Sequence, residues 1–212
     1  MKLLRFSSIS DNYRDLEITD IVIEALEVLL NHILYLRDVY PTQIFKKRRI
    51  YNTPVYISIY PPLNSYLHNV LKSARELLKN KELRCLEAKL YKEDLEEYEV
   101  YRFMIVNPIA FNKEKQDEFL IDFEEQIRAS LYLMAERLKL LPKLPNDARF
   151  KVLLQTTQAA FVKFSQNPHH QDFPWLCSNC VDKPTSKQEE ISLLPLTSIK
   201  SLNISLMADI VR

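Results

Sequence analysis

The chain contains no glycine, although it is 212 residues long. Glycine usually makes up about 7% of a protein, and it lets backbone approach a phosphate group closely. The sequence therefore has no Walker-type or dinucleotide-type phosphate loop, and no Gly-x-Ser-x-Gly nucleophile elbow. Tight turns with a positive φ must be made by other residues, and we expect Asn80, Asn107 and Asn146 to occupy such turns.

The composition is that of one globular domain spanning 1–212, with 47% hydrophobic and 27% charged residues. A net charge of +1 excludes a strong global field, so we expect no strong direct binding to nucleic acid. No membrane-length apolar stretch occurs, and 1–6 is too short and too charged for a signal peptide. Three cysteines, an odd number, argue against a disulfide framework. We expect an intracellular protein in a reducing compartment.

Apolar residues at three- and four-residue spacing predict three helices. The first spans 16–38 and ends before Pro41, because proline pushes Tyr40 out of the helical region. The second runs from Pro61 to Asn80, and the third covers about 114–140 and is ended by Pro142 and Pro145.

Alternating apolar and polar residues predict the strands. They lie at 55–59, in a hairpin formed by 86–90 and 98–106, and at 150–154. The pattern decays after about 158 and becomes extended again at 191–196 and 204–211. The predicted fold class is α+β, with three helices packed on one face of a mainly antiparallel sheet. A long tail without strong periodicity usually has a function or is disordered.

The cysteines Cys177 and Cys180 have the spacing of half a metal site or of a redox pair, and His169 and His170 lie just before them. A structural zinc site needs four ligands in tetrahedral geometry, and adjacent histidines rarely reach one ion together. Exposed or packing residues are the simpler interpretation, and the alternative is a zinc or thiol protein.

The run Lys46–Arg49 follows the turn at Tyr40-Pro41 as an extended basic segment. Three interpretations stay open: a structural or partner-facing patch, a surface that steers DNA, and a nuclear address. His32 and His68 each stand alone on a predicted helix, where packing is a simpler role than catalysis. Helical carboxylates such as Glu24 and Glu124 have no serine or histidine partner, so we expect no enzyme, no catalytic residue, no metal and no cofactor.

Trp175 is the only tryptophan, and it lies in an otherwise polar tail. A bulky aromatic must be buried against either the core or a ligand.

Three segments resemble the HORMA-domain family and, within it, the non-catalytic accessory subunits of DNA polymerase zeta. They are Tyr-Pro-x-x-Ile-Phe at 40–45, Tyr-Asn-x-Pro-Val at 51–55 and Asp-Phe-Pro-Trp at 172–175. The order of helices and strands agrees with the family along nearly the whole chain. The resemblance implies a core at about 16–156 and a C-terminal safety belt at about 158–212 that wraps around an extended peptide from a partner.

The resemblance also implies three sets of site residues. Tyr40, Tyr66 and Trp175 would line the channel for the partner peptide. The belt strands, with Leu193, Pro195, Leu196 and Met207, would bind a scaffold polymerase, although Met207 or a neighbour replaces an aromatic that the family has in the last strand. Arg128, together with Asp38 and Lys47, would mediate dimerisation, or Arg128 would be an ordinary exposed helix residue.

The function implied is that of an adaptor in the nucleus and also the cytoplasm. It would trap a closure-motif peptide of the polymerase zeta catalytic subunit and bind the C-terminal domain of the deoxycytidyl-transferase scaffold of translesion synthesis. A homodimer or HORMA heterodimer and an AAA+ remodelling ATPase are further expected partners, and a membrane is not. The alternative within the family is a spindle-checkpoint protein that binds activators of the anaphase-promoting complex.

Overall fold

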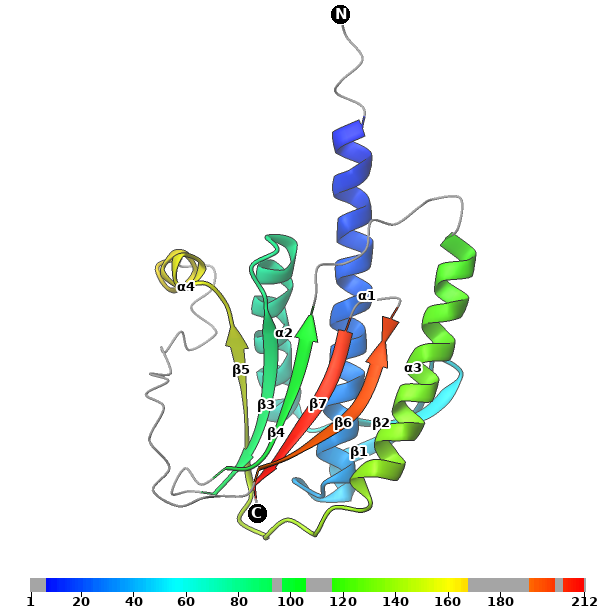
Figure 1. The fold of residues 1–212 in the computed structure, drawn as a ribbon, viewed down its shortest axis with the longest axis vertical. Coiled ribbons are helices and arrows are strands. Elements are labelled where there is room, and N and C mark those ends of the chain that lie inside the picture. Colours follow the sequence, from blue (N-terminus) through cyan, green and yellow to red (C-terminus); the bar gives the residue numbers. More distant parts are fainter. Residues whose placement is uncertain (1–6, 93–96, 106–115, 168–190, 201–203, 212) are drawn as a thin grey trace, which may run out of the picture.

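The computed structural model describes residues 7–92, 97–105, 116–167, 191–200 and 204–211. Three long helices, α1 (Ser7–Leu36), α2 (Pro61–Lys79) and α3 (Gln116–Leu138), lie on one face of a five-stranded sheet (Figure 1). The strands of this sheet are β3 (Cys85–Tyr91), β4 (Glu97–Ile105), β5 (Arg149–Gln155), β6 (Ile191–Ile199) and β7 (Ile204–Val211). The predicted α+β class is confirmed.

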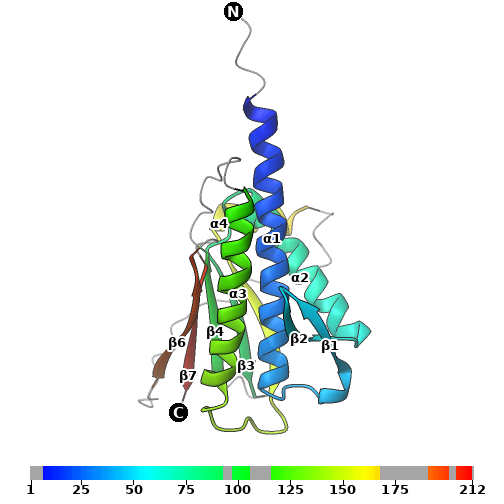
Figure 2. The same cartoon turned by 90° about the vertical axis from the view of Figure 1, so that its right-hand side faces the viewer.

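A separate two-stranded hairpin lies on the other side of α1. It consists of β1 (Phe45–Ile50) and β2 (Thr53–Ser58), which follow a short 3-10 turn, η1 (Thr42–Ile44). Figure 2 shows the resulting order of layers, with the sheet on the left, α1 and α3 in the middle and the hairpin on the right.

The five strands are antiparallel and follow the order β5-β3-β4-β7-β6. The predicted hairpin of β3 and β4 is confirmed, with Cys85 opposite Met104. The two C-terminal strands form a second hairpin of this sheet, and β7 pairs with β4 from Glu99 to Ile105. The two edges of the sheet are therefore β5, which precedes the C-terminal segment, and β6, which belongs to it.

The core lies between the sheet and the helices. Residues on the apolar stripe of α1, among them Val22, Leu26, Leu29 and Ile33, are at most 1% exposed. This helix begins at Ser7, well before the predicted residue 16, because adding residues to an already formed helix costs little. A fourth, short helix, α4 (Gln158–Ser165), was not predicted. It buries only Ala160 and Phe164 and is capped by Thr157, whose side chain accepts the N–H of Ala160.

Helices α1 and α2 both end in a Schellman motif. In α2 the N–H of Lys81 bonds to the carbonyl of Leu78 at 2.9 Å, and that of Glu82 bonds to Leu77 at 2.8 Å. Lys81 has φ 58°, a position where glycine is usual.

Asp38 has the same role after α1, with φ 51°. The expectation that Asn80 and Asn146 take positive φ was wrong: Asn80 has φ −82°, since the left-handed position falls one residue later, and Asn146 is not among the positive-φ residues. Asn107 lies outside the described residues.

The hairpin turns through Tyr51 and Asn52, with φ 48° and 56°. Ile50 pairs with Thr53 across this two-residue loop, which is the geometry of a type I′ turn. Tyrosine is unusual at the first position of such a turn. Its ring packs edge to face on Phe123 of α3, with 5.1 Å between centroids, and this contact stabilises the turn.

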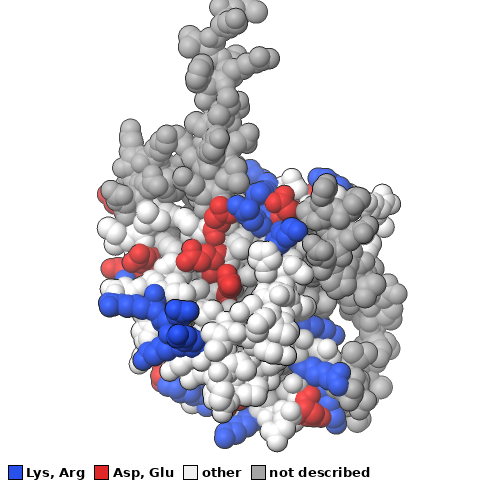
Figure 3. All heavy atoms as spheres, turned by 180° about the vertical axis from the view of Figure 1, so that it is seen from behind, with Lys and Arg blue, Asp and Glu red and all other residues white. Residues whose placement is uncertain are grey.

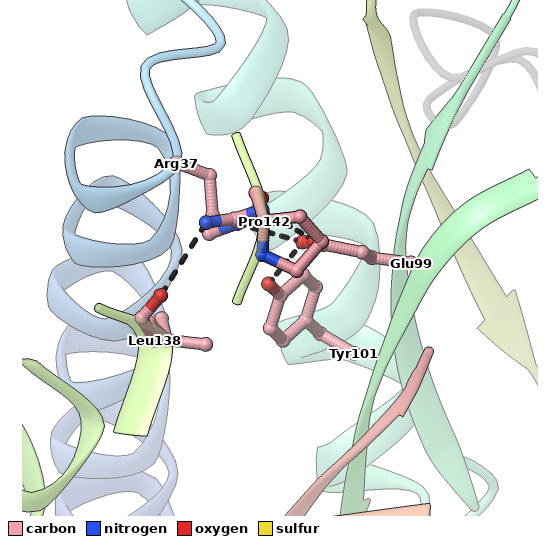
Figure 4. Close-up of polar contacts among 5 residues, drawn as sticks. All are labelled: Arg37, Glu99, Tyr101, Leu138 and Pro142. Atoms are coloured by element: carbon pink, nitrogen blue, oxygen red, sulfur yellow. Dashed lines mark hydrogen bonds and ion pairs between the residues drawn. The ribbon is translucent and has the colours of Figure 1, made fainter. Parts of the chain in front are cut away.

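A buried polar network joins the end of α1 to β4 and to the segment after α3 (Figure 4). Arg37 donates to both carboxylate oxygens of Glu99 and to the carbonyls of Leu138 and Pro142. The hydroxyl of Tyr101 donates to Glu99 at 2.5 Å. Burial, followed by the Glu99 carboxylate, holds the pKa of Tyr101 well above its ordinary value, so the phenol keeps the proton that it donates.

Candidate functional site

Tyr66 of α2 makes a direct contact with the open edge of the main sheet. Its hydroxyl oxygen accepts the backbone N–H of Val152 in β5 at 2.8 Å. Its ring packs edge to face on Phe150, with centroids 6.0 Å apart. Burial raises the pKa of Tyr66, so the hydroxyl is a neutral group fixed on the strand.

This hydrogen bond reveals which backbone groups of β5 face outward. The Val152 N–H points away from β3, and backbone groups alternate along a strand, so those of Phe150 and Leu154 also face the edge. The carbonyl of Gln155 faces the other way, since it accepts the N–H of Arg84. Within the described chain β5 has one neighbouring strand, so an extended peptide could add beside it through the outward groups of Phe150 and Leu154, while the Val152 N–H stays bonded to Tyr66.

Tyr40, another predicted channel residue, lies close enough to Tyr66 to influence its ionisation. Burial, and then the neighbouring phenols of Tyr60 and Tyr91, raise the pKa of Tyr40. Burial, and then the phenols of Tyr40 and Tyr91, likewise raise the pKa of Tyr66. The end of α1, the start of α2 and the end of β3 thus bring four tyrosines together beside β5.

Two residues of β5 that contact this tyrosine cluster were not predicted from the sequence to do so. Phe150 packs on Tyr66, and the Nζ atom of Lys151 lies 4.4 Å from the centre of the Tyr91 ring. Both come from β5, whose register sets Tyr91 opposite Arg149. An alternating strand pattern at 150–154 does not show which neighbour it will meet.

Trp175, the third predicted channel residue, lies outside the described residues, as do His169, His170, Cys177 and Cys180. The described cysteine, Cys85, is buried and unpaired in β3, and burial raises its pKa to about 12. Among the described residues no group of three or more His, Cys, Asp or Glu could hold a metal ion. His32 is buried and His68 is exposed.

The C-terminal hairpin of β6 and β7 is held on β4 by side chains as well as by backbone. Arg102 of β4 bonds Glu87 of β3 at 2.8 Å on one side and forms an ion pair with Asp209 of β7 on the other. Gln155 of β5 also donates to Glu87 at 2.8 Å. A polar ladder therefore runs across four strands, from one side of the sheet into the C-terminal hairpin.

The predicted scaffold-binding residues lie on this hairpin. Pro195 is exposed and sits opposite the half-buried Met207, next to a bulge. Leu196 is fully buried, and its carbonyl accepts a hydrogen bond from Arg137 of α3 at 2.8 Å. Leu193 lies in β6, but its side chain is outside the described part.

A groove of about 460 Å³ runs between α3 and the C-terminal hairpin. Its lining includes Leu133 and Arg137 of α3 together with Pro195 and Met207. Leu133 is 40% exposed, and the neighbouring Tyr132 is 67% exposed. The groove thus combines exposed apolar side chains of the helix with exposed residues of the strands. Such exposed apolar patches are common at protein interfaces.

The three predicted dimerisation residues come from different elements. Asp38 is exposed at the end of α1, Lys47 is exposed on β1, and Arg128 is half-buried on α3. The buried Nε atom of Arg128 has no hydrogen-bond partner in the described structure. No contact among the three is seen in the described residues.

No helix of the described chain is both long and apolar enough to cross a membrane.

Solved structures with the same fold are HORMA-domain assemblies. A chain of a mitotic checkpoint complex superposes with a TM-score of 0.67 and 17% identity, covering 91% of this chain and 97% of that chain. Caenorhabditis elegans HTP-1 bound to a HIM-3 closure motif superposes with a TM-score of 0.63 and 12% identity, covering 92% and 91%. The fold is the HORMA fold.

Sequence relatives show which group of HORMA proteins the chain resembles. No family model matches the sequence. DNA polymerase zeta subunit 2 of Drosophila melanogaster is 43% identical over 188 residues, which is 88% of this chain and 93% of the relative. The mitotic spindle assembly checkpoint protein MAD2B is 31% identical in Danio rerio and 29% identical in Homo sapiens, each over 87% of this chain and 85% of the relative. The chain belongs to the HORMA family of polymerase zeta accessory subunits and MAD2B proteins, which supports an adaptor role.

Proposed function

We propose that the protein is a non-catalytic adaptor that captures an extended closure peptide of the DNA polymerase zeta catalytic subunit. The peptide pairs with the open edge of β5, and the C-terminal segment closes over it. The observation that carries the proposal is the position of Tyr66, fixed on the outward N–H of Val152 and flanked by Tyr40. Relatives named as polymerase zeta subunits and fold relatives solved with closure motifs support it.

The topology of the sheet supports a trap rather than a simple groove. The described chain leaves β5 at one edge of the sheet and returns as β6 at the opposite edge, and the proposed belt is the segment between them. A peptide paired with β5 and enclosed by that connection leaves only when the segment opens. Dissociation is therefore slow even where individual contacts are modest, and an AAA+ remodelling ATPase is the partner expected to open it.

Capture is tested by calorimetric titration with the closure peptide of the catalytic subunit. Tyr66→Ala and Trp175→Ala each weaken binding by about 2 kcal/mol or more, the usual loss for a buried interface aromatic. Tyr66→Phe separates packing from the hydroxyl, since it keeps the ring against Phe150. His68→Ala, an exposed change on the same helix, is the control. Unchanged affinity in both alanine variants removes the channel assignment.

The second surface is proposed to bind the C-terminal domain of the translesion deoxycytidyl-transferase scaffold. The groove beside Pro195 and Met207 is the candidate, with Leu193 on the same strand. Leu196 is buried, so it would not contact the scaffold directly. Its packing would instead hold the bulge of β6 in shape. Met207→Glu is expected to abolish scaffold binding while closure-peptide capture persists.

Dimerisation through Arg128, with Asp38 and Lys47, is a further part of the proposal. An unpartnered buried Nε atom supports a role for Arg128 beyond solubility. Light scattering on the peptide-bound protein tests it: the Arg128→Ala variant is monomeric and retains capture. A wild-type protein that is monomeric at high concentration contradicts the dimer.

The second candidate function is a spindle-checkpoint role, favoured by the relatives named as checkpoint proteins. A pull-down from dividing cells followed by mass spectrometry separates the two. Recovery of polymerase zeta subunits supports the adaptor of translesion synthesis, which acts in the nucleus. Recovery of activators of the anaphase-promoting complex alone supports the checkpoint role.

A further inference from the structure

The hairpin strand β1 carries the most concentrated positive charge of the described chain, and the closure-peptide site does not use it. Its four central residues, Lys46, Lys47, Arg48 and Arg49, are all exposed. No carboxylate of the described residues pairs with any of them; the polar contact seen is between Arg49 and the side chain of Asn52. Figure 3 shows basic residues gathered on this side of the molecule, with acidic residues next to them.

The register of the hairpin shows which backbone groups of β1 are open. The N–H of Ile59 bonds to the carbonyl of Ile44 at 2.7 Å, which makes this a hydrogen-bonded pair. Alternate residues repeat that pattern, so Lys46 and Arg48 direct their backbone groups toward β2. Lys47 and Arg49 direct theirs to the other side, where β1 has no neighbouring strand in the described structure.

An open hollow of about 490 Å³ lies against the hairpin near its turn. It is lined by Lys47, Arg48 and Arg49 together with Asn52 and Pro54. Backbone hydrogen-bonding groups and cationic side chains are therefore presented together, along a strand of six residues. Such an edge recognises an extended chain through its backbone and selects it through its charge.

We propose that β1 is a docking edge for an acidic, extended peptide segment of a partner protein. Opposite charges on neighbouring strands stabilise pairing, and like charges destabilise it. Lysine and arginine on an edge strand therefore prevent association with a second copy of the same edge while leaving it open to an acidic one.

Two observations favour a short peptide over a nucleic acid. The edge presents carbonyls as well as N–H groups, and carbonyls pair with a peptide but repel phosphate. Acidic residues also lie next to the basic patch (Figure 3). Among them, Glu24 and Glu124 are exposed, and after burial their carboxylates contribute to the raised pKa of Tyr51 at the turn. A long polyanion that followed β1 past the turn would meet these carboxylates, whereas a peptide of the strand's length would not.

The test uses fluorescence anisotropy of a labelled synthetic peptide that alternates glutamate and threonine. The full-length wild-type protein binds it saturably. The variant Lys46→Glu/Arg48→Glu binds about tenfold more weakly or worse, since two attractive cross-strand pairs become repulsive. The matched control, Lys143→Glu/Lys200→Glu, makes the same change in net charge at exposed sites elsewhere and binds like the wild type.

A second peptide with the same charges but proline in place of threonine tests strand pairing. Proline lacks the N–H that the edge carbonyls require, so this peptide binds at least about tenfold more weakly. Equal binding of both peptides overturns the proposal, as does the absence of saturable binding. Labelled oligothymidylate that binds through Lys46 and Arg48 more tightly than the acidic peptide also overturns it, in favour of a nucleic-acid surface.

The inference stands apart from the proposed capture of a closure peptide at β5. The Lys46→Glu/Arg48→Glu variant retains closure-peptide binding, and Tyr66→Ala retains binding of the acidic peptide. Failure at one edge therefore leaves the other unaffected.

Discussion

The Nη2 atom of Arg37 lies 2.6 Å from the Oε1 atom of Glu99, and both side chains are at most 5% exposed. This pair ties the end of the central helix to the middle of the sheet. Removing one partner leaves a buried charge without compensation, which typically costs 3–5 kcal/mol. Replacing both costs less than the two single changes together, because no lone charge is left.

We therefore expect Glu99→Gln to lower the free energy of unfolding by about 3 kcal/mol or more. The double variant Arg37→Met/Glu99→Gln should lose less unfolding free energy than the two single variants lose together. Urea denaturation measures both. Glu76→Gln is the control, since Glu76 pairs with Lys79 at the surface and its loss costs about 0.5 kcal/mol or less. A Glu99→Gln variant as stable as this control contradicts the interpretation.

The elements with a strong apolar period could be predicted from the sequence. The stripes of α2 and α3 and the alternation in β3, β4 and β5 produced elements close to the observed bounds, whereas α1 begins at Ser7 rather than at the predicted residue 16. The short α4 could not, because two buried residues in eight give no clear period. The pair Arg37 and Glu99 could not either, since nothing in a sequence links residues that are 62 positions apart.

The candidate site was predictable only in part, and for a similar reason. The resemblance pointed to Tyr40 and Tyr66, which lie together beside β5. Tyr91 and Lys151 meet because β3 and β5 pair in one register, which an alternating pattern does not specify. The left-handed positions were mistaken because they depend on where each helix ends, and not on which residue tolerates positive φ best.

Burial makes His32 a source of pH dependence. Its Nε2 atom lies 3.0 Å from the carbonyl of Leu131 and therefore donates to it, while Nδ1 is buried without a partner in the described structure. Desolvation lowers the pKa of His32 below its ordinary value of 6.5. The unfolded chain then binds a proton before the folded one does, so stability is full above about pH 6.5 and falls as the pH drops below it.

The variant His32→Gln keeps a donor for the Leu131 carbonyl and does not titrate. We expect the wild type to lose more stability than His32→Gln between pH 7.5 and 5.5, as measured by urea denaturation at each pH. His68→Gln, at an exposed position, should retain the wild-type dependence. Parallel pH profiles for wild type and His32→Gln would falsify the assignment.

Lys81 occupies a left-handed position that glycine adopts at less cost. A residue with a Cβ atom pays about 1–2 kcal/mol there, partly offset by the greater entropy of glycine in the unfolded chain. Lys81→Gly is therefore expected to stabilise the protein by about 0.5–1 kcal/mol. His68→Gly, on the exposed face of the same helix, should instead destabilise it by about 1 kcal/mol. Thermal denaturation distinguishes the two, and destabilisation by both would show that the Schellman geometry is not limiting.

The ion pair between Arg102 and Asp209 connects the fixed part of the sheet to the C-terminal hairpin. Asp209→Asn removes that charge pair, while the backbone pairing of β7 with β4 can persist. The hairpin then opens more often than the rest of the sheet. We expect amides of β7 to exchange about tenfold faster, which corresponds to about 1.4 kcal/mol of opening free energy. Amides shared by β3 and β5 should keep their protection, because no contact between those strands is lost.

Hydrogen-exchange mass spectrometry measures this in the free and peptide-bound protein. Asp20→Asn, which breaks an exposed pair between α1 and Arg75 of α2, is the matched control and leaves β7 unchanged. Closure peptide should restore protection of β7 in the Asp209→Asn variant, because a bound peptide and a docked hairpin stabilise the same closed state. Acceleration spread evenly over β3, β5 and β7 would mean that the ladder supports the whole sheet, and that the hairpin is a fixed part of the core rather than the moving end of a belt.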